Sequence, residues 1–391
     1  MSFQSITSNK TADSAEAQAN LPELLKFLQL LVELESPSDD KAAVDRCVDL
    51  AAKRAESMGG RVRRHRQKNF GDLLEVRFGR RGRAVKPILL LGHLDTVWPI
   101  GTLAKMPFRI DSGRVWGPGV LDMKAGVAMA FAAIETLQQR YGAAMPPVVL
   151  LLVSEEEVGS PVSRAVTERI AGECAAVYVL EPAQGLYPGA YKTARKGVGH
   201  YRIHITGVAA HSGIDFASGH SAIAELAHQI EAIHGFTDMQ RGITVNVGTI
   251  QGGTRSNVVA AEASAEVDVR VARKIDAARV DRQFRRLRAR DKQCVLKVEG
   301  GLNRPPMERS RGTVALFKRA ATLARAMGFD LQEAATGGGS DGNFTSALGI
   351  PTLDGMGAVG EGAHATHESL LLKDLGPRTA LLAAMLMKPE E

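Results

Sequence analysis

The sequence is poor in cysteine and has no hydrophobic run long enough to cross a membrane. Its three cysteines, Cys47, Cys174 and Cys294, are far apart and have no CxxC spacing, so they predict buried free thiols and neither a disulfide framework nor a zinc ribbon. No apolar stretch approaches the roughly 20 residues that a membrane span requires. Residues 1–20 are polar and lack the apolar segment of a signal peptide. We therefore expect no membrane partner, a flexible N-terminal tail over residues 1–20 and a cytoplasmic protein.

The sequence also lacks a strong excess of charge of one sign. Lysine and arginine number 49 against 43 acidic residues, and the basic residues are dispersed along the chain. One dense cluster, Arg279–Arg290, lies on a predicted helix without any nucleic-acid motif. We interpret it as a solvated helix face and expect no nucleic-acid partner. The 391 residues, 45% of them hydrophobic, are enough for two globular domains.

Three short apolar runs each end in residues that bind metals or transfer protons. They are Pro87–Leu91, which leads to His93 and Asp95; Val148–Val153, which leads to Glu155–Glu157; and Ala175–Leu180, which leads to Glu181. Runs that are apolar at every position are typical of parallel strands buried on both faces. Open α/β sheets bind their ligands at the carboxyl ends of such strands. We therefore expect these polar side chains to converge on one edge of a sheet.

The order of predicted elements indicates an α/β domain interrupted by a second domain. Helical periodicity and short strands extend over residues 21–196, and the same character resumes over residues 304–391. Between them, residues 197–303 contain four alternating strands and two helices in the order β-α-β-β-α-β of a ferredoxin-like unit. The fold class that we predict is α/β: a mixed, largely parallel sheet with helices on both faces, and an inserted α+β domain.

The polar side chains at the predicted sheet edge are of the types that bind zinc, namely histidine nitrogens and carboxylate oxygens. Asp122 joins them because it lies just ahead of a long apolar helix. The candidate ligands are His93, Asp122, Glu156, Glu157, Glu181 and His364. Two metal ions that share one carboxylate need about this many ligands, and a further carboxylate would act as general base toward a water molecule. Asp95 is placed to accept the other ring N–H of His93.

Each of these features alone has a simpler explanation. A single His-x-Asp is more often a hydrogen-bonded pair, and three consecutive glutamates are usually a solvated turn. Solvation does not explain why three acids follow a six-residue apolar run at the end of a buried strand. The combination therefore favours a metal site.

Five motifs resemble, in order, those of the co-catalytic di-zinc metallopeptidases. They are Gly92-His-Leu-Asp95-Thr-Val, Trp116-Gly-Pro-Gly-Val-Leu-Asp122-Met-Lys, Ser154-Glu-Glu-Glu157-Val-Gly-Ser160, Leu180-Glu181-Pro182 and Gly362-Ala-His364. That family includes glutamate carboxypeptidases, acetylornithine deacetylases, succinyl-diaminopimelate desuccinylases and aminoacylases. The resemblance spans roughly residues 20 to 388 and implies a zinc exopeptidase-like fold.

The resemblance also implies roles for the metal-site residues. Asp122 would bridge two zinc ions, with His93 and Glu181 completing one site and Glu157 and His364 the other. Glu156 would be the general base, with Glu155 as the alternative. His367 is a competing ligand, but His364 is favoured because Glu368 then falls at the matching acidic position. Cobalt or manganese are possible substitutes for zinc.

The inserted domain resembles the family's lid and dimerisation domain, which implies a homodimer. His211 matches a lid histidine that stabilises the tetrahedral oxyanion, although without the family context a histidine that caps the turn would be preferred. Asn257 and Arg270 match positions that hold the substrate carboxylate, which arginine can bind through two hydrogen bonds. Arg304 is a third candidate contact for an anion.

The activity that this resemblance implies is that of a glutamate carboxypeptidase-like exopeptidase. It would hydrolyse the amide bond to a C-terminal amino acid in a small peptide or N-acyl amino acid. The segment Asp95–Leu103 and the pair Pro107-Phe108 resemble the carboxypeptidase branch more than the deacetylases. Two alternatives remain: an N-acyl amino acid deacylase, and a non-catalytic binding protein.

Overall fold

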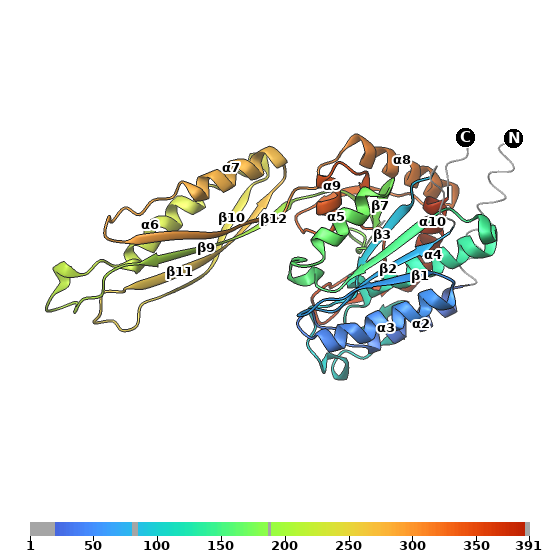
Figure 1. Cartoon of the computed structure of the whole chain (residues 1–391), viewed down its shortest axis with the longest axis horizontal. Helices are drawn as coiled ribbons and strands as arrows, with labels where there is room; N and C mark the ends of the chain where they lie inside the picture. Colours follow the sequence, from blue (N-terminus) through green and yellow to red (C-terminus); the bar gives the residue numbers. More distant parts are fainter. Residues whose placement is uncertain (1–19, 80–84, 187–188, 388–391) are drawn as a thin grey trace. The chain divides into compact units, whose positions relative to one another are not determined.

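A computed structural model of the chain describes residues 20–79, 85–186 and 189–387. Most of the tail predicted over residues 1–20 therefore lies outside the described residues. The chain forms two compact units (Figure 1). Unit 1 comprises the described residues up to Thr193, Arg309–Ala335 and those from Ser340 onward, and unit 2 comprises Ala194–Glu308 with Thr336–Gly339. None of the described helices has the length and apolar character needed to span a membrane.

Unit 1 is built on a six-stranded sheet with the strand order β1-β2-β6-β3-β7-β14. The strands are β1 (Arg61–His65), β2 (Leu73–Phe78), β3 (Ile88–His93), β6 (Val148–Val153), β7 (Ala176–Val179) and β14 (Thr352–Leu353). Strand β3 is parallel to β6 and β7, and β14 is parallel to β7, whereas β1 and β2 are antiparallel additions. The sheet is therefore mixed and largely parallel, as predicted.

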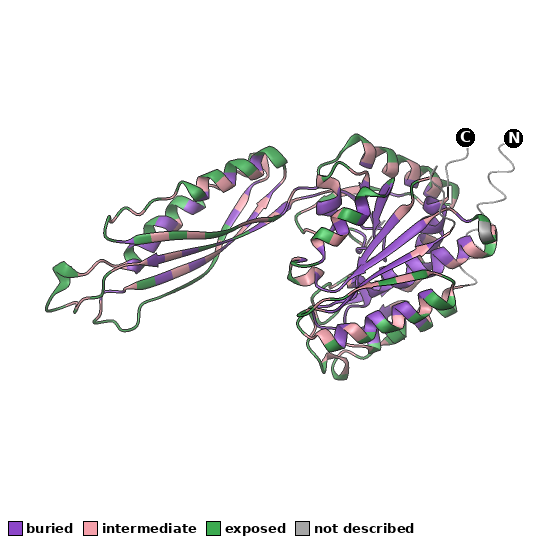
Figure 2. Ribbon diagram, viewed as in Figure 1, coloured by how far each residue is buried: buried purple, intermediate pink, exposed green. Residues whose placement is uncertain are grey.

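Alternate residues of the central strands face two separate hydrophobic cores. On β3, Leu90 belongs to the larger core, whereas Leu89 and Leu91 belong to the smaller one. The helices of unit 1 are α2 (Leu21–Glu33), α3 (Lys41–Ser57), α4 (Ala125–Tyr141), α5 (Arg164–Gly172), α8 (Arg311–Ala326), α9 (Gly342–Ala347) and α10 (Leu372–Leu386). Side chains of α2, α3, α4, α8 and α10 contribute to the larger core and those of α5 to the smaller one. Helices therefore cover both faces, which explains why every residue of β6 is buried (Figure 2).

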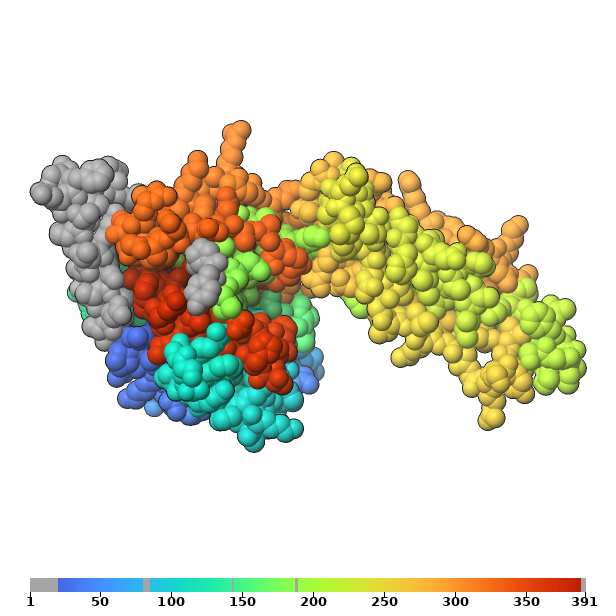
Figure 3. All heavy atoms as spheres, turned by 180° about the vertical axis from the view of Figure 1, so that it is seen from behind, coloured from blue at the N-terminus to red at the C-terminus, as the bar shows by residue number. Residues whose placement is uncertain are grey.

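A small second sheet in unit 1 joins segments that are distant in the sequence. Its order is β15-β16-β5-β4, with the strands β4 (Arg109–Asp111), β5 (Arg114–Trp116), β15 (Gly360–Glu361) and β16 (Ser369–Leu371). The pairing of β5 with β16 places the segment before Asp122 beside the loop that carries His364. In Figure 3 the teal residues around β4 and β5 accordingly lie against the red residues near the C-terminus. A further two-stranded sheet pairs β8 (Tyr191–Arg195) with β13 (Glu333–Thr336).

Unit 2 is an antiparallel four-stranded sheet with two helices. Its elements are β9 (Gly197–Thr206), α6 (Ala222–His234), β10 (Thr244–Gly252), β11 (Glu262–Val271), α7 (Lys274–Arg285) and β12 (Val295–Arg304). The strand order is β10-β11-β9-β12. Along β9, Tyr201 and Ile203 pack into the core shared with the helices, whereas His200 and Arg202 are exposed. The element order is the predicted β-α-β-β-α-β.

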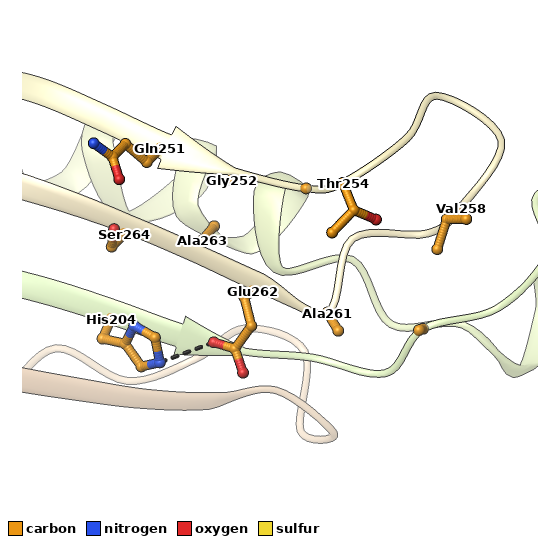
Figure 4. Close-up of a pocket in the computed structure, with 11 residues that line it drawn as sticks. His204, Gln251, Gly252, Thr254, Val258, Ala261, Glu262, Ala263 and Ser264 are labelled. Atoms are coloured by element: carbon orange, nitrogen blue, oxygen red, sulfur yellow. Dashed lines mark ion pairs between the residues drawn. The ribbon is translucent and has the colours of Figure 1, made fainter.

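The predicted domain boundaries at residues 197 and 303 lie close to those of unit 2, which extends from Ala194 to Glu308. Residues 336–339 also group with this unit, and the Arg195 guanidinium donates to the carbonyls of Gly338 and Gly339. A cavity of about 400 Å³ lies toward the end of the unit 2 sheet opposite Arg195, beside the ion pair of His204 with Glu262 (Figure 4).

Candidate metal centre

The predicted metal ligands of unit 1 come from strand ends and from two loops. His93 is the last residue of β3, Glu156 and Glu157 follow β6, and Glu181 follows β7. Because these strands are parallel neighbours, their carboxyl ends meet at one edge of the sheet. The remaining two ligands arrive from outside the main sheet: Asp122 lies in the irregular segment Val120–Lys124 ahead of α4, and His364 lies in the loop between β15 and β16.

Asp122 lies between the two histidines. Its Oδ1 atom is 3.3 Å from Nε2 of His93, and its Oδ2 atom is 3.4 Å from Nε2 of His364. The two oxygens of one carboxylate thus face two different imidazoles. This is the arrangement that a carboxylate needs to bridge two metal ions.

Each histidine also has a glutamate beside it. Oε1 of Glu181 is 3.8 Å from Nε2 of His93, and Oε2 of Glu157 is 3.2 Å from Nε2 of His364. Ligand atoms of His93, Glu156 and Glu181 lie within 4.8 Å of one another, which places the predicted base in the same cluster. Atoms that bind one zinc ion tetrahedrally at 2.0–2.1 Å are separated by roughly 3.3 Å. The donor types and their spacing therefore fit two metal ions that share Asp122.

The electrostatics of the cluster favour bound positive charge. Hydrogen bonds to Asp122 and Glu157 raise the pKa of His364 to about 10. Burial lowers the pKa of His93, but hydrogen bonds to Asp122 and Asp95 outweigh this effect and raise the pKa well above its usual value. Burial raises the pKa of Glu157. The carboxylates around these two imidazoles create a negative electrostatic potential, which raises both histidine pKa values. The same potential would stabilise bound metal cations.

Asp95 lies at the second ring nitrogen of His93, where it was predicted to accept an N–H. Nδ1 of His93 is 2.9 Å from the main-chain oxygen of Asp95 and 3.4 Å from its carboxylate, so the carbonyl is the nearer acceptor. The buried carboxylate also accepts hydrogen bonds from the backbone N–H groups of Glu156 and Glu157, at 3.2 and 3.1 Å. Asp95 therefore holds the ring mainly through its backbone carbonyl, and its side chain also holds the glutamate turn.

Ser38 completes the environment of Asp95, and the sequence analysis assigned it no site role. Its hydroxyl donates to Oδ2 of Asp95 at 2.6 Å, and both residues are buried. The sequence Ser36-Pro-Ser38 is typical of a turn that follows a helix. The available signal was the polar Ser-Pro-Ser sequence directly after an amphipathic helix, which is too common to indicate a site.

The structure separates the predicted residues from their alternatives. Glu155 is fully buried, and its carboxylate accepts from the backbone N–H groups of Ser154, Val162 and Ser163. It supports the loop and does not face the cluster as a base would. His364, and not His367, contacts Asp122 and Glu157. His364 has a φ of 63°, a left-handed conformation that is uncommon for a residue other than glycine and is typical of functional sites.

Two of the predicted site residues of unit 2 lie together in neighbouring loops. The backbone N–H of Ser212 donates to the Asn257 carbonyl at 3.0 Å, and His211 forms an isolated bridge with Val258. Nδ1 of His211 accepts the backbone N–H groups of Gly213 and Ile214, at 3.1 and 3.2 Å. The ring therefore caps a turn, as the simpler interpretation expected, and this leaves the proton of the neutral ring on Nε2.

The two arginines lie at the opposite end of the unit 2 sheet. Arg270 forms a bidentate ion pair with Asp268, with both N–O distances at 2.9 Å, and it also donates to the Gly337 carbonyl at 3.4 Å. Arg304 is 5% exposed. Val198 of β9 pairs with Arg270, whereas Thr206 pairs with Glu262. The strand between these pairs is about 26 Å long, and the His211 loop follows Thr206.

Most of the sequence matches a known family. The profile described as "Peptidase family M20/M25/M40" matches residues 89–388. The chain belongs to this family. It is thus a hydrolase of the metallopeptidase class, as the motif resemblance predicted, and the non-catalytic alternative is not supported.

Individual relatives agree with this assignment. The chain is 27% identical over 373 residues to carboxypeptidase G2 of Pseudomonas sp. (strain RS-16), which covers 94% of this chain and 89% of that protein. Its fold resembles that of aminopeptidase PepT from Bacillus cereus, with a TM-score of 0.75, 23% identity and coverage of 94% and 98%. It also resembles the Bacillus subtilis YXEP protein, described as a dinuclear metal binding peptidase, with a TM-score of 0.71, 17% identity and coverage of 94% and 98%. At these identities the two structures show a shared fold.

Proposed function

We propose that this M20 peptidase is a zinc-dependent carboxypeptidase that hydrolyses the amide bond to a C-terminal amino acid. The observation that carries the proposal is the position of Asp122, whose two oxygens face His93 and His364. A relative along most of the chain is named as a carboxypeptidase, which supports this direction of cleavage.

His93, Asp122 and Glu181 would hold one zinc ion, and Asp122, Glu157 and His364 would hold the other. When bound, such ions acidify a water molecule and polarise the carbonyl of the scissile amide. The imidazole of His93 has its Nδ1 atom directed at the Asp95 carbonyl, which leaves Nε2 as the ligand atom.

Glu156 would act as the general base. Its carboxylate lies among the ligand atoms of His93 and Glu181, and its backbone is held by Asp95. Glu156 would accept a proton as the water oxygen bonds to the amide carbon, and would then deliver that proton to the nitrogen as the C–N bond breaks. The products are a free carboxylate on the acyl side and the amine of the released amino acid.

His211 would donate its Nε2–H to the oxyanion, and Arg270, Arg304 and Asn257 would hold the substrate carboxylate. Because about 26 Å of strand separates the Arg270 end of the sheet from the His211 end, one copy of unit 2 cannot bring both residues to one small substrate. This separation supports a homodimer in which the second copy supplies His211 and Asn257 to the site. The residues that each chain contributes can therefore be distinguished by experiment.

The test is the release of free amino acid from a panel of N-acyl and peptidyl substrates, before and after chelation and after zinc is restored. The panel includes C-terminal glutamate, aspartate, ornithine and neutral residues, each with a small acyl and a bulky donor group. Zinc-dependent release of a C-terminal amino acid from bulky or peptidyl donors is the expected result. Release only from small acyl donors would instead identify an N-acyl amino acid deacylase.

A further inference from the structure

We propose that Glu368 is a positioning residue that holds Asp122 between the two histidines. The proposal rests on the metal centre described above and deepens it, since it concerns a residue outside the ligand set. It makes Glu368 the connection between the loop that carries Asp122 and the loop that carries His364.

Glu368 is a buried carboxylate that accepts four N–H groups. Oε1 accepts the backbone N–H groups of Leu121 at 2.9 Å and Asp122 at 3.1 Å. Oε2 accepts the backbone N–H of Gly119 and the indole N–H of Trp98, both at 2.8 Å. The residue is 1% exposed. Four donors around one anionic group form charge-assisted hydrogen bonds, which are stronger than neutral ones.

The segment that carries Asp122 needs such an acceptor because its own backbone is irregular. Gly119 has a φ of 67°, and Asp122 and Met123 have non-helical φ and ψ angles. N–H groups ahead of a helix have no intrahelical partner, and a buried N–H without an acceptor is costly. The carboxylate of Glu368 supplies the acceptor at three of these positions. It thereby fixes the backbone from which the Asp122 side chain extends.

The same residue is tied to His364 through its own backbone. The N–H of Ala365 donates to the Gly362 carbonyl at 2.8 Å, and the N–H of Glu368 donates to the Ala365 carbonyl at 2.9 Å. These consecutive turns make His364 and Glu368 parts of one compact loop. Strand β16, which begins at Ser369, anchors that loop to β5. A displacement of Glu368 would therefore change the distance between Asp122 and His364.

Glu225 of unit 2 provides a matched control. It is 2% exposed and likewise accepts backbone N–H groups of a loop, from Arg290 at 3.0 Å and Asp291 at 2.9 Å. It also accepts the side-chain amide of Gln229 at 2.7 Å. A change of either glutamate to glutamine keeps the size of the side chain and replaces one acceptor oxygen with an NH₂ donor. Only the change at Glu368 should disturb the metal centre, because Glu225 contacts a loop of unit 2.

The experiment compares Glu368→Gln, Glu225→Gln and the unaltered protein by zinc competition against a chelator and by the visible absorption of the cobalt-loaded forms. Loss of an outer hydrogen-bond partner typically weakens metal affinity 10- to 100-fold. We expect a loss of this size in Glu368→Gln, with an altered cobalt spectrum and a lower kcat at saturating zinc. Glu225→Gln should keep the affinity and spectrum of the unaltered protein even where its melting temperature falls.

A folded Glu368→Gln variant with unchanged zinc affinity, cobalt spectrum and kcat would overturn the proposal. If this variant does not fold, Glu368→Asp takes its place with the same expected weakening. If neither folds while Glu225→Gln does, Glu368 is a determinant of folding and the positioning role is rejected. Metal affinity is measured without substrate, so this test remains valid even if the carboxypeptidase assignment fails.

Discussion

In the metal-free protein, the stability of unit 1 should fall as the pH rises from about 6.5 to about 10. In the metal-free cluster, hydrogen bonds to Asp122 and Glu157 raise the pKa of His364 from 6.5 to about 10. A group whose pKa is higher in the folded state binds its proton more tightly there. The resulting stabilisation is complete below the unfolded pKa and is lost as the pH approaches the folded one. The raised pKa of His93 acts in the same direction.

The size of the effect follows from the exposure of His364. A shift of this size would contribute ~5 kcal/mol in a fully shielded site, because one pKa unit corresponds to about 1.4 kcal/mol. Half of the His364 side chain is exposed, at 50%, and solvent screening reduces the contribution to ~1–2 kcal/mol. A change of 1 kcal/mol shifts the melting temperature of a large domain by about 2–4 °C. We therefore expect the titration of His364 to lower the melting temperature of the chelated protein by roughly 2–8 °C over this pH range.

The assay is thermal unfolding of chelated and zinc-loaded protein at several pH values between 6 and 10. His364→Gln, also chelated, serves as the control for every other titrating group. The stability difference between the unaltered protein and this variant should shrink as the pH rises. The zinc-loaded protein should not show this loss, because its imidazoles bind the metal without their protons. A difference that stays constant across the pH range would refute the electrostatic account of the cluster.

Three further predictions follow from individual contacts. Glu156→Gln should lower kcat by about 10²- to 10⁴-fold, the usual contribution of a general base, while the protein still binds two zinc ions; substantial activity in this variant would show that the base is another group. When the His211→Ala and Glu156→Gln proteins are mixed and exchange subunits, about a quarter of full activity should return, because half of the randomly formed dimers contain one intact site out of two. No recovery would argue against a His211 supplied by the partner subunit. Gly126→Ala should lower the urea midpoint by an amount equivalent to about 1–3 kcal/mol, because its Cβ atom would lie 2.0 Å from the Leu180 carbonyl; an unchanged midpoint would show that α4 can shift away from β7.

The clustering of the candidate ligands could be predicted because strand burial and metal chemistry leave separate marks in the sequence. A strand buried on both faces, such as β6, must be apolar throughout. Acids that follow it directly, such as Glu156 and Glu157, therefore stand out. The positions of parallel strand ends then follow from topology alone. The contacts of Asp122 with His93 and His364 agree with the arrangement that the motif resemblance implied.

The supporting contacts could not be predicted, because they depend on how loops fold. Nothing in the sequence shows that the Asp95 carboxylate turns toward the N–H groups of Glu156 and Glu157. Likewise, residues 336–339 group with unit 2 through contacts between distant segments, such as the hydrogen bond from Arg195 to Gly338, which spans more than a hundred residues. The separation of His211 from Arg270 required the register of β9 with β11. Periodicity predicts that strands exist, and it does not specify which residues face each other across them.

The discontinuity of unit 1 has a consequence for biosynthesis. The chain that follows Thr193 builds nearly all of unit 2 before it returns to unit 1 at Arg309. At roughly 5–20 residues per second, His364 is synthesised on the order of tens of seconds after His93 and Asp122. A nascent chain therefore exposes an incomplete set of ligands. A metal ion that uses His364 as a ligand would bind only after nearly the whole polypeptide has left the ribosome.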